Sequence, residues 1–408
     1  MNAKKKVLLL GFGMQGKGAL YDLLRFGAFD EITVADSRID RSAITFPVDE
    51  RRVRFVELDA SAPGALLKAC RGMDVVMTLL PRSFVLEVAE AAAEAGAHFA
   101  CASYLEEPAE KDPAAAERRR QRIEVLDRKC REKGLACLTQ FGLDPGLDLF
   151  LAGQAIRQLD TVTAFRSYGS GFPEITAATN PLKYKFTWTP SGVMSSYVRP
   201  ARVIRDGLAV DIPGEQIFNP ENIHEMDAPE LGGTLECFAN GDAVHYAKEL
   251  GIAGTATDMG RYVCRWPGHC AFWRVFVQCG FLDETPVDMG EYRVVPREFA
   301  ARLLWNRPEF HYGLQERDVA MVLVEAKGTR DGKPSVARYG IVDMRDLETG
   351  FTAMTRTVGF VLALGAEAIA DGTVSGTGVL LPMDLPWDPI VEKLALRGIT
   401  VTGGAGPA

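Results

Sequence analysis

The sequence lacks the metal-binding and redox patterns that cysteine and histidine usually form. Only 5 of its 408 residues are histidine, and none of its 8 cysteines forms a Cys-x-x-Cys pair. Cys264, His269 and Cys270 lie close together, but no fourth ligand follows at the spacing of a zinc site. We therefore expect no bound metal, and cysteines that act as small buried residues in a reducing compartment.

An excess of positive charge and a long apolar run are also absent. The formal net charge is -8, with a pI near 5.4. The basic run at residues 118–122 lies in an alanine- and charge-rich stretch with helical spacing, which is typical of a solvated helix face. No stretch approaches the roughly 18 apolar residues of a membrane span, and the first apolar run is too short for a signal peptide. We expect a cytoplasmic protein that binds neither nucleic acid nor membranes.

What the sequence does contain is a regular alternation of strand-like and helix-like segments over its first hundred residues. Four apolar strands are expected at residues 6–12, 31–37, 52–60 and 73–81, with helical spacing between them. Strict alternation of strand and helix predicts a parallel sheet with helices on both faces. The fold class predicted for residues 1–125 is therefore α/β, a doubly wound domain of the Rossmann type.

The pattern changes after an expected helix at residues 113–133. Residues 318–328 and 335–344 alternate polar and apolar positions on either side of the turn sequence RDGKP, which predicts an antiparallel hairpin. A strong helix is expected near residues 352–371, stopped by Gly372. We predict a second, α+β domain with a mixed sheet over residues 126–354.

Three glycines follow the first strand in the spacing of a dinucleotide-binding loop. Gly11, Gly13 and Gly16, with Met14 and Gln15 between them, come directly after an apolar strand and open a helix. Bare backbone at this place lets a pyrophosphate approach the amides and the positive end of the helix dipole. We expect these five residues to bind a dinucleotide.

An acidic residue stands where the ribose of such a cofactor is usually held. Asp36 lies twenty positions after Gly16 and ends the second strand. A carboxylate there accepts hydrogen bonds from the ribose hydroxyls and repels a 2′-phosphate, which favours NAD. Arg38, with Ser37 beside it, offers the alternative of holding the 2′-phosphate of NADP.

Further cofactor contacts are expected at the carboxyl ends of the next strands, where ligands of such sheets bind. The third strand ends at Asp59 and Ala60, and the fourth at Leu79, Leu80 and Pro81. Ordinary loop roles for these five residues are an equal alternative.

Several motifs together resemble one enzyme family. They are the glycine loop, Ser103-Tyr104, GLDPG at 142–146, NPLKYKFTW at 180–188, ANGDAVHY at 239–246, and GVLLPM followed by DPIVEKL near the end. The chain resembles the saccharopine dehydrogenases, in particular the glutamate-forming type also called saccharopine reductase, and the related lysine 6-dehydrogenases. The resemblance covers nearly the whole chain.

The resemblance implies oxidation of a carbon–nitrogen bond in a lysine-derived amino acid. NAD(P) accepts hydride from the carbon beside a secondary amine, and water adds to the resulting imine. Glutamate and 2-aminoadipate 6-semialdehyde would then be released. The resemblance also implies that residues 355–408 pack back on the nucleotide domain and that the second domain builds a homodimer.

The resemblance implies site residues in the first half of the chain. Ser103 would contact the cofactor, and Tyr104, Leu143 and Asp144 would line the substrate pocket. Asp144 would pair with a substrate ammonium or accept a proton in catalysis. Its alternative role is an aspartate that caps the helix beginning at Pro145.

Further residues are implied in the second domain. Asn180 and Tyr184 would bind substrate, and Lys185 would be a carboxylate partner or a proton relay, with a surface lysine and a packing tyrosine as the alternatives. Asn240 and Arg265 would also bind substrate. His269 would exchange a proton with the imine, because histidine titrates near neutrality, or else would be structural.

The sequence departs from the family pattern at three positions. Ser191 stands in place of an arginine expected to hold a substrate carboxylate, Gly169 replaces a pocket cysteine, and Gly241 replaces an arginine. The lost arginine, with the stretch WPGHC, favours lysine 6-dehydrogenase as an alternative activity. A nucleotide-binding scaffold without catalysis is a second alternative.

Overall fold

A computed structural model describes residues 4–106 and 112–408 of the chain. These residues form two compact units. Unit 1 comprises residues up to 150 together with 355–401, and unit 2 comprises 151–354 together with 402–408. Helix α5 (Leu147–Arg157) spans the chain boundary between them.

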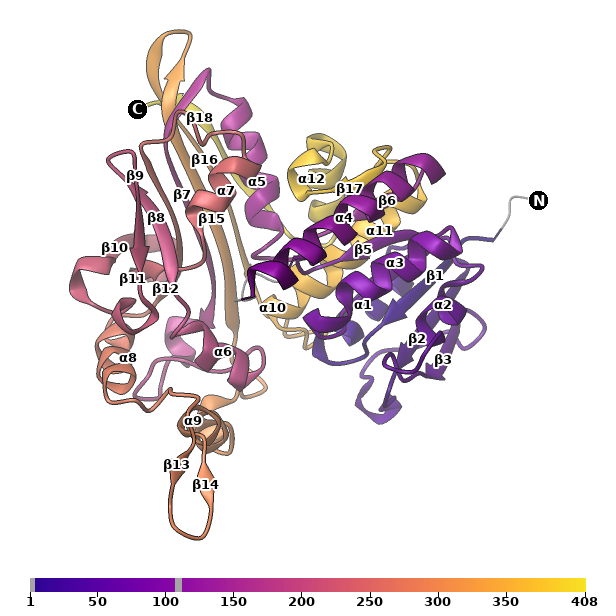
Figure 1. Cartoon of the computed structure of the whole chain (residues 1–408), viewed down its shortest axis with the longest axis horizontal. Helices are drawn as coiled ribbons and strands as arrows, with labels where there is room; N and C mark the ends of the chain where they lie inside the picture. Colours follow the sequence, from indigo (N-terminus) through magenta and orange to yellow (C-terminus); the bar gives the residue numbers. More distant parts are fainter. Residues whose placement is uncertain (1–3, 107–111) are drawn as a thin grey trace. The chain divides into compact units, whose positions relative to one another are not determined.

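Unit 1 is built on a seven-stranded parallel sheet with the order β17-β6-β5-β4-β1-β2-β3 (Figure 1). Its strands are β1 (Lys6–Leu10), β2 (Glu31–Asp36), β3 (Val53–Glu57), β4 (Val75–Thr78), β5 (His98–Cys101), β6 (Ala136–Leu138) and β17 (Gly378–Leu380). Its helices are α1 (Met14–Arg25), α2 (Ala65–Cys70), α3 (Val85–Ala95), α4 (Pro113–Lys133), α11 (Val361–Ala370) and α12 (Trp387–Leu396). The predicted doubly wound fold is confirmed.

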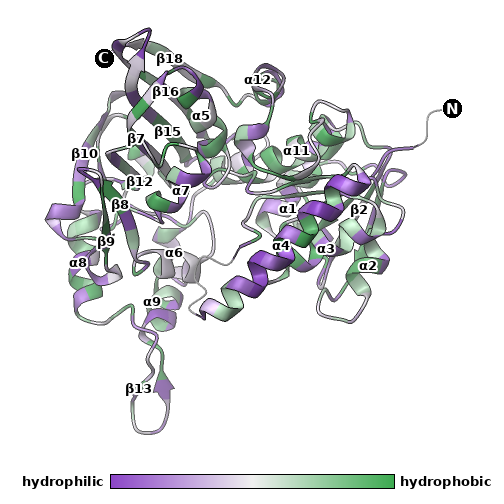
Figure 2. Ribbon diagram, turned by 45° about the horizontal axis from the view of Figure 1, so that its top comes forward, coloured by the Kyte–Doolittle hydropathy of each residue, from purple (hydrophilic) through white to green (hydrophobic). Residues whose placement is uncertain are grey.

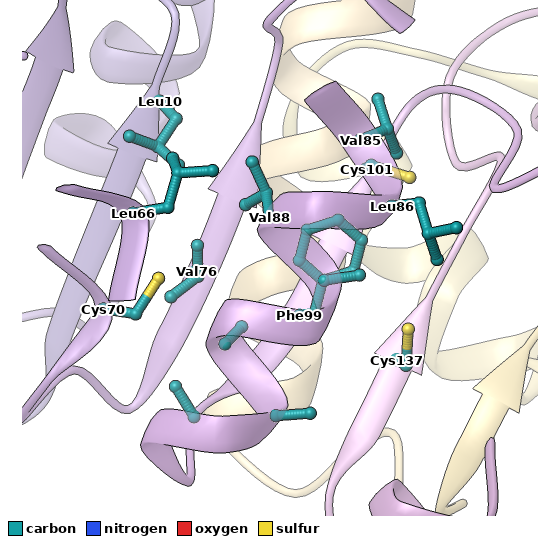
Figure 3. Close-up of a cluster of buried hydrophobic side chains, with 14 of the residues drawn as sticks. Leu10, Leu66, Cys70, Val76, Val85, Leu86, Val88, Phe99, Cys101 and Cys137 are labelled. Carbon is teal, nitrogen blue, oxygen red and sulfur yellow. The ribbon is translucent and has the colours of Figure 1, made fainter. Parts of the chain in front are cut away.

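Helices cover both faces of this sheet because its strands are apolar on both sides. Helices α2, α3 and α4 pack together on one face, while α1 and α11 pack on the other. Figure 3 shows the first of these layers, where Val76 and Phe99 of the sheet meet Val85, Leu86 and Val88 of α3. The outer face of α4 is hydrophilic (Figure 2), as its charge-rich sequence predicts.

Unit 2 is built on a nine-stranded mixed sheet with the order β10-β11-β12-β7-β15-β16-β18, in which β8 also pairs with β12 and β9 pairs with β8. The strands are β7 (Thr161–Pro173), β8 (Ala201–Arg205), β9 (Leu208–Ile212), β10 (Ile223–Ala228), β11 (Gly233–Ala239), β12 (Asp258–Arg265), β15 (Asp318–Arg330), β16 (Lys333–Met344) and β18 (Val401–Pro407). The helices are α6 (Pro190–Ser196), α7 (Ala243–Glu249), α8 (His269–Gln278) and α9 (Pro296–Trp305). A separate hairpin is formed by β13 (Val287–Asp288) and β14 (Arg293–Val294).

The predicted hairpin is the β15–β16 pair, and its turn explains the register. Arg330 pairs with Lys333 across a two-residue turn in which Asp331 and Gly332 both have positive φ, 52° and 71°. Such a turn matches the twist of the two strands and is typical of an Asp-Gly sequence. Pairing then continues in register to Val319 and Met344.

Short helical segments connect these elements. They are the 3₁₀ helices η1 (Arg41–Ala43), η2 (Arg82–Phe84), η3 (Ile175–Ala177), η4 (Gly214–Gln216), η5 (Pro220–Asn222), η6 (Pro229–Leu231), η7 (Pro308–Phe310) and η9 (Pro382–Asp384), with α10 (Ala353–Thr355) and the π-helical turn η8 (Arg356–Phe360). The expected helix near 352–371 therefore contains a π turn that its periodicity did not predict.

The unit boundaries differ from the expected domain limits in two places. Unit 1 extends to residue 150 instead of ending near 125, because α4 contacts β6 and β17 and β6 pairs with β5 of the sheet. The last residues, 402–408, belong to unit 2 because β18 lies beside β16 in its sheet.

One helical stretch among the described residues, Ala353–Ala370, has the length and apolar content to cross a membrane. Most of this stretch is buried, and α11 packs on β4 and β5. That environment is typical of the core helix of a globular unit.

Candidate functional site

The glycine loop connects β1 to α1 in unit 1, and two of its glycines are required by packing. A Cβ on Gly11, whose φ is +96°, would lie 2.8 Å from the carbonyl carbon of Leu79. A Cβ on Gly16 would lie 2.1 Å from the Gly11 oxygen. The loop and the helix therefore approach more closely than any side chain would allow.

Gly13 is different, because nothing in the protein requires it to be a glycine. Its φ of -73° is open to any residue, and a Cβ there would have no neighbour within 4 Å. Gly13 is the N-cap of α1, so no side chain caps the helix, and no acidic residue lies in its first turn. The missing side chain leaves a cradle in front of the amides of Met14, Gln15 and Gly16, as an anionic phosphate group needs.

The loop lies at the point where the strand order of the sheet reverses. β1 pairs with β2 on one side and with β4 on the other. Ligands of such sheets bind at this reversal, outside the carboxyl ends of the strands. Leu79 donates its amide to Leu10 at 2.7 Å, so Leu79, Leu80 and Pro81 leave the sheet directly beside Gly11.

Asp36 is held against the glycine loop at the end of β2. One carboxylate oxygen accepts from the Phe12 amide at 2.6 Å, and the other accepts from the Arg38 amide at 3.1 Å and the Ser37 hydroxyl at 3.2 Å. These bonds fix the acid where the second strand ends, which is the position that a ribose would use. The Arg38 side chain is exposed.

The other predicted contacts of unit 1 lie at successive strand ends. Asp59, exposed after β3, accepts from the hydroxyl and amide of Ser61, which hold the pKa of its carboxyl below the usual value. Ala60 follows it and is half-buried. Ser103, after β5, accepts at its backbone oxygen from the amide of Gln140 at 3.0 Å. Tyr104 has the guanidinium of Arg82 at 5.1 Å from its ring centre.

Asp144 lies in a turn between β6 and α5 that contains a cis Asp144–Pro145 bond. Its side chain is half-buried, whereas the neighbouring Leu143 is buried. At the start of α5 the Gly146 amide donates to the carboxylate of Asp148 at 2.6 Å. Asp148 was not predicted, because an aspartate inside an apolar helix start carries no distinct sequence signal.

In unit 2, Asn180 uses its whole side-chain amide to shape its own loop. Its nitrogen donates to the backbone oxygens of Tyr184, at 2.6 Å, and Glu309, at 2.9 Å. Its oxygen accepts from the amides of Leu182, at 3.1 Å, and Tyr184, at 3.2 Å. In this arrangement Asn180 positions Tyr184.

Lys185 is buried and paired with an acid. Its ammonium donates to both carboxylate oxygens of Glu316, at 2.8 and 2.6 Å. The predicted alternative of a surface lysine is therefore wrong, because only 4% of the side chain is exposed. Glu316 lies 131 residues further along the chain, so no local pattern could have indicated the pair.

Arg265 is the unusual charge of unit 2, because it is buried without a counter-ion. It is 5% exposed, and its guanidinium donates to the backbone oxygen of Cys264 at 2.8 Å. Among the described residues, the side chains that interact with its charge are those of Tyr197, Tyr184 and Cys264, and no carboxylate is among them. The guanidinium lies 4.9 Å from the ring centre of Tyr184. An unpaired buried cation is costly, so this arginine is suited to receiving an anionic group.

The groups near Arg265 are also donors that lack acceptors. Buried atoms without a hydrogen-bond partner among the described residues include Nε of Arg265, the hydroxyl of Tyr184 and Nε1 of Trp273. Trp273 belongs to the same aromatic cluster through Tyr197 and His269. A carboxylate is the kind of ligand that such donors satisfy.

His269 packs into this cluster but does not have the properties of a proton carrier at neutral pH. Its Nε2 lies 2.9 Å from the Tyr197 hydroxyl and its Nδ1 lies 3.2 Å from the Leu182 oxygen. Burial and the nearby Arg265 charge lower its pKa to about 3. The expectation that His269 titrates near neutrality is wrong, because the ring is fully enclosed.

The remaining predicted residues, Gly169 and Asn240, lie within and just after strands of the unit 2 sheet. Gly169 lies within β7 opposite Val322, and the Asn240 amide, just after β11, donates to the Arg261 oxygen at 2.8 Å. Asp242 caps α7 by accepting from the amides of Val244 and His245. Thus Tyr184, Arg265 and His269 come together, while Lys185 pairs separately with Glu316.

Comparison with known proteins gives the family. A model of the saccharopine dehydrogenase C-terminal domain matches residues 142–399, and one of the saccharopine dehydrogenase NADP binding domain matches residues 7–138. The chain belongs to the saccharopine dehydrogenase family. The resemblance inferred from its motifs is confirmed.

Relatives of this family align over nearly all of the chain. A saccharopine dehydrogenase [NADP(+), L-glutamate-forming] of Schizosaccharomyces pombe is 26% identical, covering 96% of this chain and 97% of its own length. The alpha-aminoadipic semialdehyde synthase of Arabidopsis thaliana is 31% identical over 57% of this chain, and the mouse mitochondrial form is 26% identical over 98%. This chain spans only 21% and 48% of those two proteins.

Solved structures give the same fold. Apo saccharopine dehydrogenase (L-Glu forming) from Saccharomyces cerevisiae superposes with a TM-score of 0.79 at 22% identity, covering 98% of this chain and 100% of the other. A homospermidine synthase from Legionella pneumophila, in complex with NAD, gives 0.60 at 13% identity, with coverage of 100% and 92%.

The buried His269 predicts an acid-dependent loss of stability. Its pKa is about 3 in the folded chain and near 6.5 when unfolded, so the unfolded state binds more protons between these values. Stability should fall as the pH drops below about 6, with His269 contributing up to about 1.4 kcal/mol per pH unit. In His269→Gln, urea unfolding measured at several pH values should show a shallower fall. Equal slopes in both proteins would contradict the assignment.

The open position of Gly13 predicts a loss of binding without a loss of stability. Gly13→Val should leave the melting temperature nearly unchanged, because the Cβ of the new side chain would have no protein atom within 4 Å, while NADH or NADPH binding weakens by at least about tenfold. Gly16→Ala is the contrasting variant, since its Cβ would collide with Gly11 and reduce both quantities. Calorimetry and nucleotide fluorescence measure the two effects. Unchanged nucleotide affinity in Gly13→Val would show that the cradle is not used.

Proposed function

We propose that this chain is an NAD(P)-dependent oxidoreductase that oxidises the CH–NH group of a lysine-derived amino acid. The first candidate is L-glutamate-forming saccharopine dehydrogenase. In that reaction saccharopine, NAD(P)+ and water give glutamate, 2-aminoadipate 6-semialdehyde, NAD(P)H and a proton.

The observation that carries this proposal is the glycine loop at the start of α1. It occurs in a chain that aligns over nearly its whole length with proteins named L-glutamate-forming saccharopine dehydrogenase. Two of the loop's glycines are required by packing, and the third opens the first turn of α1. The alignments cover 96% of the chain in the proteins of both yeasts named above. A bound dinucleotide would supply the hydride acceptor of the reaction.

This chain's own residues would bind and orient the two reactants. The amides at the start of α1 would hold the pyrophosphate, and Asp36 would hold the adenosine ribose. Arg265 would take a carboxylate of the substrate, because it is the buried cation without a counter-ion. Asp144 would accept the proton that the amine releases. Lys185, neutralised by Glu316, would act by positioning its loop.

The cofactor proposed is NAD, with NADP as an accepted second nucleotide. The fixed carboxylate of Asp36 favours NAD, because a 2′-phosphate beside it would bring two negative charges together. Arg38 is exposed next to it and offers a partner for the phosphate of NADP. The family model that matches this domain is named for NADP.

Lysine 6-dehydrogenase is the second candidate activity. Ser191 is the second residue of α6, directly after Pro190, and is exposed, in the place where the resemblance expects an arginine that holds a carboxylate. Without that arginine, a substrate with fewer carboxylates becomes the alternative. A nucleotide-binding scaffold would bind the cofactor and turn over neither compound.

A direct assay separates these functions. The purified chain with NAD+ or NADP+ should form the reduced nucleotide with saccharopine at a kcat/KM at least about tenfold above that with lysine, because only saccharopine supplies the extra carboxylates. Mass spectrometry should detect glutamate as a product. Turnover of lysine alone would replace the first candidate with the second, and nucleotide binding without turnover would support the scaffold.

We also propose that the protein is a homodimer assembled through unit 2. Its support is a set of exposed apolar side chains on α8, on the connection that follows it, on α9 and on the β13–β14 hairpin, which extends away from the rest of unit 2 in Figures 1 and 2. These side chains are Phe272, Val275, Phe281, Val287, Met289, Tyr292, Phe299 and Leu303. An isolated hairpin is marginal in water, and apolar surfaces of this kind are typical of interfaces.

Light scattering of the purified protein should then give the mass of two chains. Met289→Asp should shift the population toward single chains, because it places a charge in the apolar surface. Leu208→Asp is the matched control, since Leu208 is 70% exposed on β9 and should leave the mass unchanged. A wild-type mass of one chain would contradict the proposal.

A further inference from the structure

The helical segment that enters unit 1 after residue 354 contains a π turn at Arg356–Phe360, followed by α11. A π turn inserts an extra residue into a helix and is found disproportionately at functional sites. Here the turn packs against α1, the helix that begins at the glycine loop, while α11 continues along the sheet against β4 and β5. The π turn and α11 both contact α1, and α11 contacts the sheet as well.

Two glycines outside the dinucleotide loop allow this close contact. A Cβ on Gly359 of the π turn would lie 2.5 Å from the Gln15 oxygen and 3.0 Å from the Ala19 nitrogen, both in the backbone of α1. A Cβ on Gly18 of α1 would lie 2.3 Å from Cγ2 of Thr355. At Gly359 the backbone of the π turn therefore contacts the backbone of α1 directly, and no side-chain rotation could make room for a Cβ there.

Residues from the carboxy-terminal part of unit 1 also contact Tyr21 and Asp22, one to two turns further along α1. The Tyr21 ring stacks on Phe360 with ring centres 5.6 Å apart. Asp22, fully buried, accepts two hydrogen bonds from Arg397, at 2.7 and 2.9 Å, and Arg397 also donates to Glu367 of α11 at 2.6 Å. From Gln15 to Asp22, one side of α1 is thus fixed by residues 355–397.

The first of these contacts reaches the turn that would bind phosphate. Gln15, whose oxygen meets Gly359, lies in the first turn of α1 between the amides of Met14 and Gly16. Hydrogen bonds to a phosphate depend on donor positions within a few tenths of an ångström. A side chain at position 359 would push the backbone of α1 at Gln15, and the phosphate-binding amides with it.

We propose that Gly359 is a positioning residue for the cofactor: its bare backbone sets the place of the first turn of α1 and thereby the affinity for the dinucleotide. The proposal rests on the proposed dinucleotide-dependent function. It assigns a role in cofactor binding to a residue more than 340 positions away from the glycine loop.

The test compares two glycines of the same helical segment. Gly359→Ala should raise the dissociation constant for NADH or NADPH, measured by nucleotide fluorescence, at least tenfold. Gly365→Ala is the matched control, because its Cβ would lie 2.6 Å from the Phe141 side chain and away from α1. The control should lower the melting temperature yet change the dissociation constant less than twofold. Equal dissociation constants in Gly359→Ala and the wild type would overturn the proposal.

A second pair of variants covers the case in which Gly359→Ala does not fold. Gly18→Ala should also weaken nucleotide binding, because its Cβ meets Thr355. Adding Thr355→Ser removes the colliding methyl group and should restore the wild-type dissociation constant to within twofold. Failure of this rescue, in a folded double variant, would count against positioning through this contact. A wild-type chain that binds neither nucleotide would overturn the proposed function itself.

Discussion

The close approach of backbone to backbone around helix α1 is the constraint on which the nucleotide unit depends. Gly11 and Gly16 bring the loop and the helix together on one side, and Gly359 brings the π turn against the helix on another. A helix that carries an exposed, uncapped first turn has few contacts of its own at that end. Its place must therefore be set by neighbouring backbone, and glycine is the residue that permits this.

Unit 2 contains two buried basic side chains, Lys185 and Arg265, which are neutralised to different extents. Lys185 is compensated by Glu316, whereas Arg265 has a backbone oxygen and the side chains of Tyr197, Tyr184 and Cys264 beside it but no carboxylate among the described residues. The first arrangement is complete without a ligand, and the second is not. This contrast is why we assign substrate binding to Arg265 and a positioning role to Lys185, although the sequence motifs treated both as site residues.

Much of the fold could be predicted because its signals are local. The four apolar strands, the helix at residues 113–133 and the Asp331-Gly332 turn each follow from neighbours a few residues apart. The π turn at Arg356–Phe360 could not be predicted. Over so few residues, the pattern of apolar positions does not distinguish a π turn from a regular α-helix. The place of residues 402–408 could not be predicted either, because strand pairing with β16 is a long-range choice.

The sequence by itself determined the glycine loop, the acid at the end of the second strand and membership of the family, since these depend on residue type and spacing. Only the tertiary structure decided the electrostatic state of the candidate site. It enclosed His269 so that its pKa falls to about 3, joined Lys185 to an acid 131 residues away, and left Arg265 without one. Charge and protonation depend on burial and on neighbours in space, and those neighbours come from distant parts of the chain.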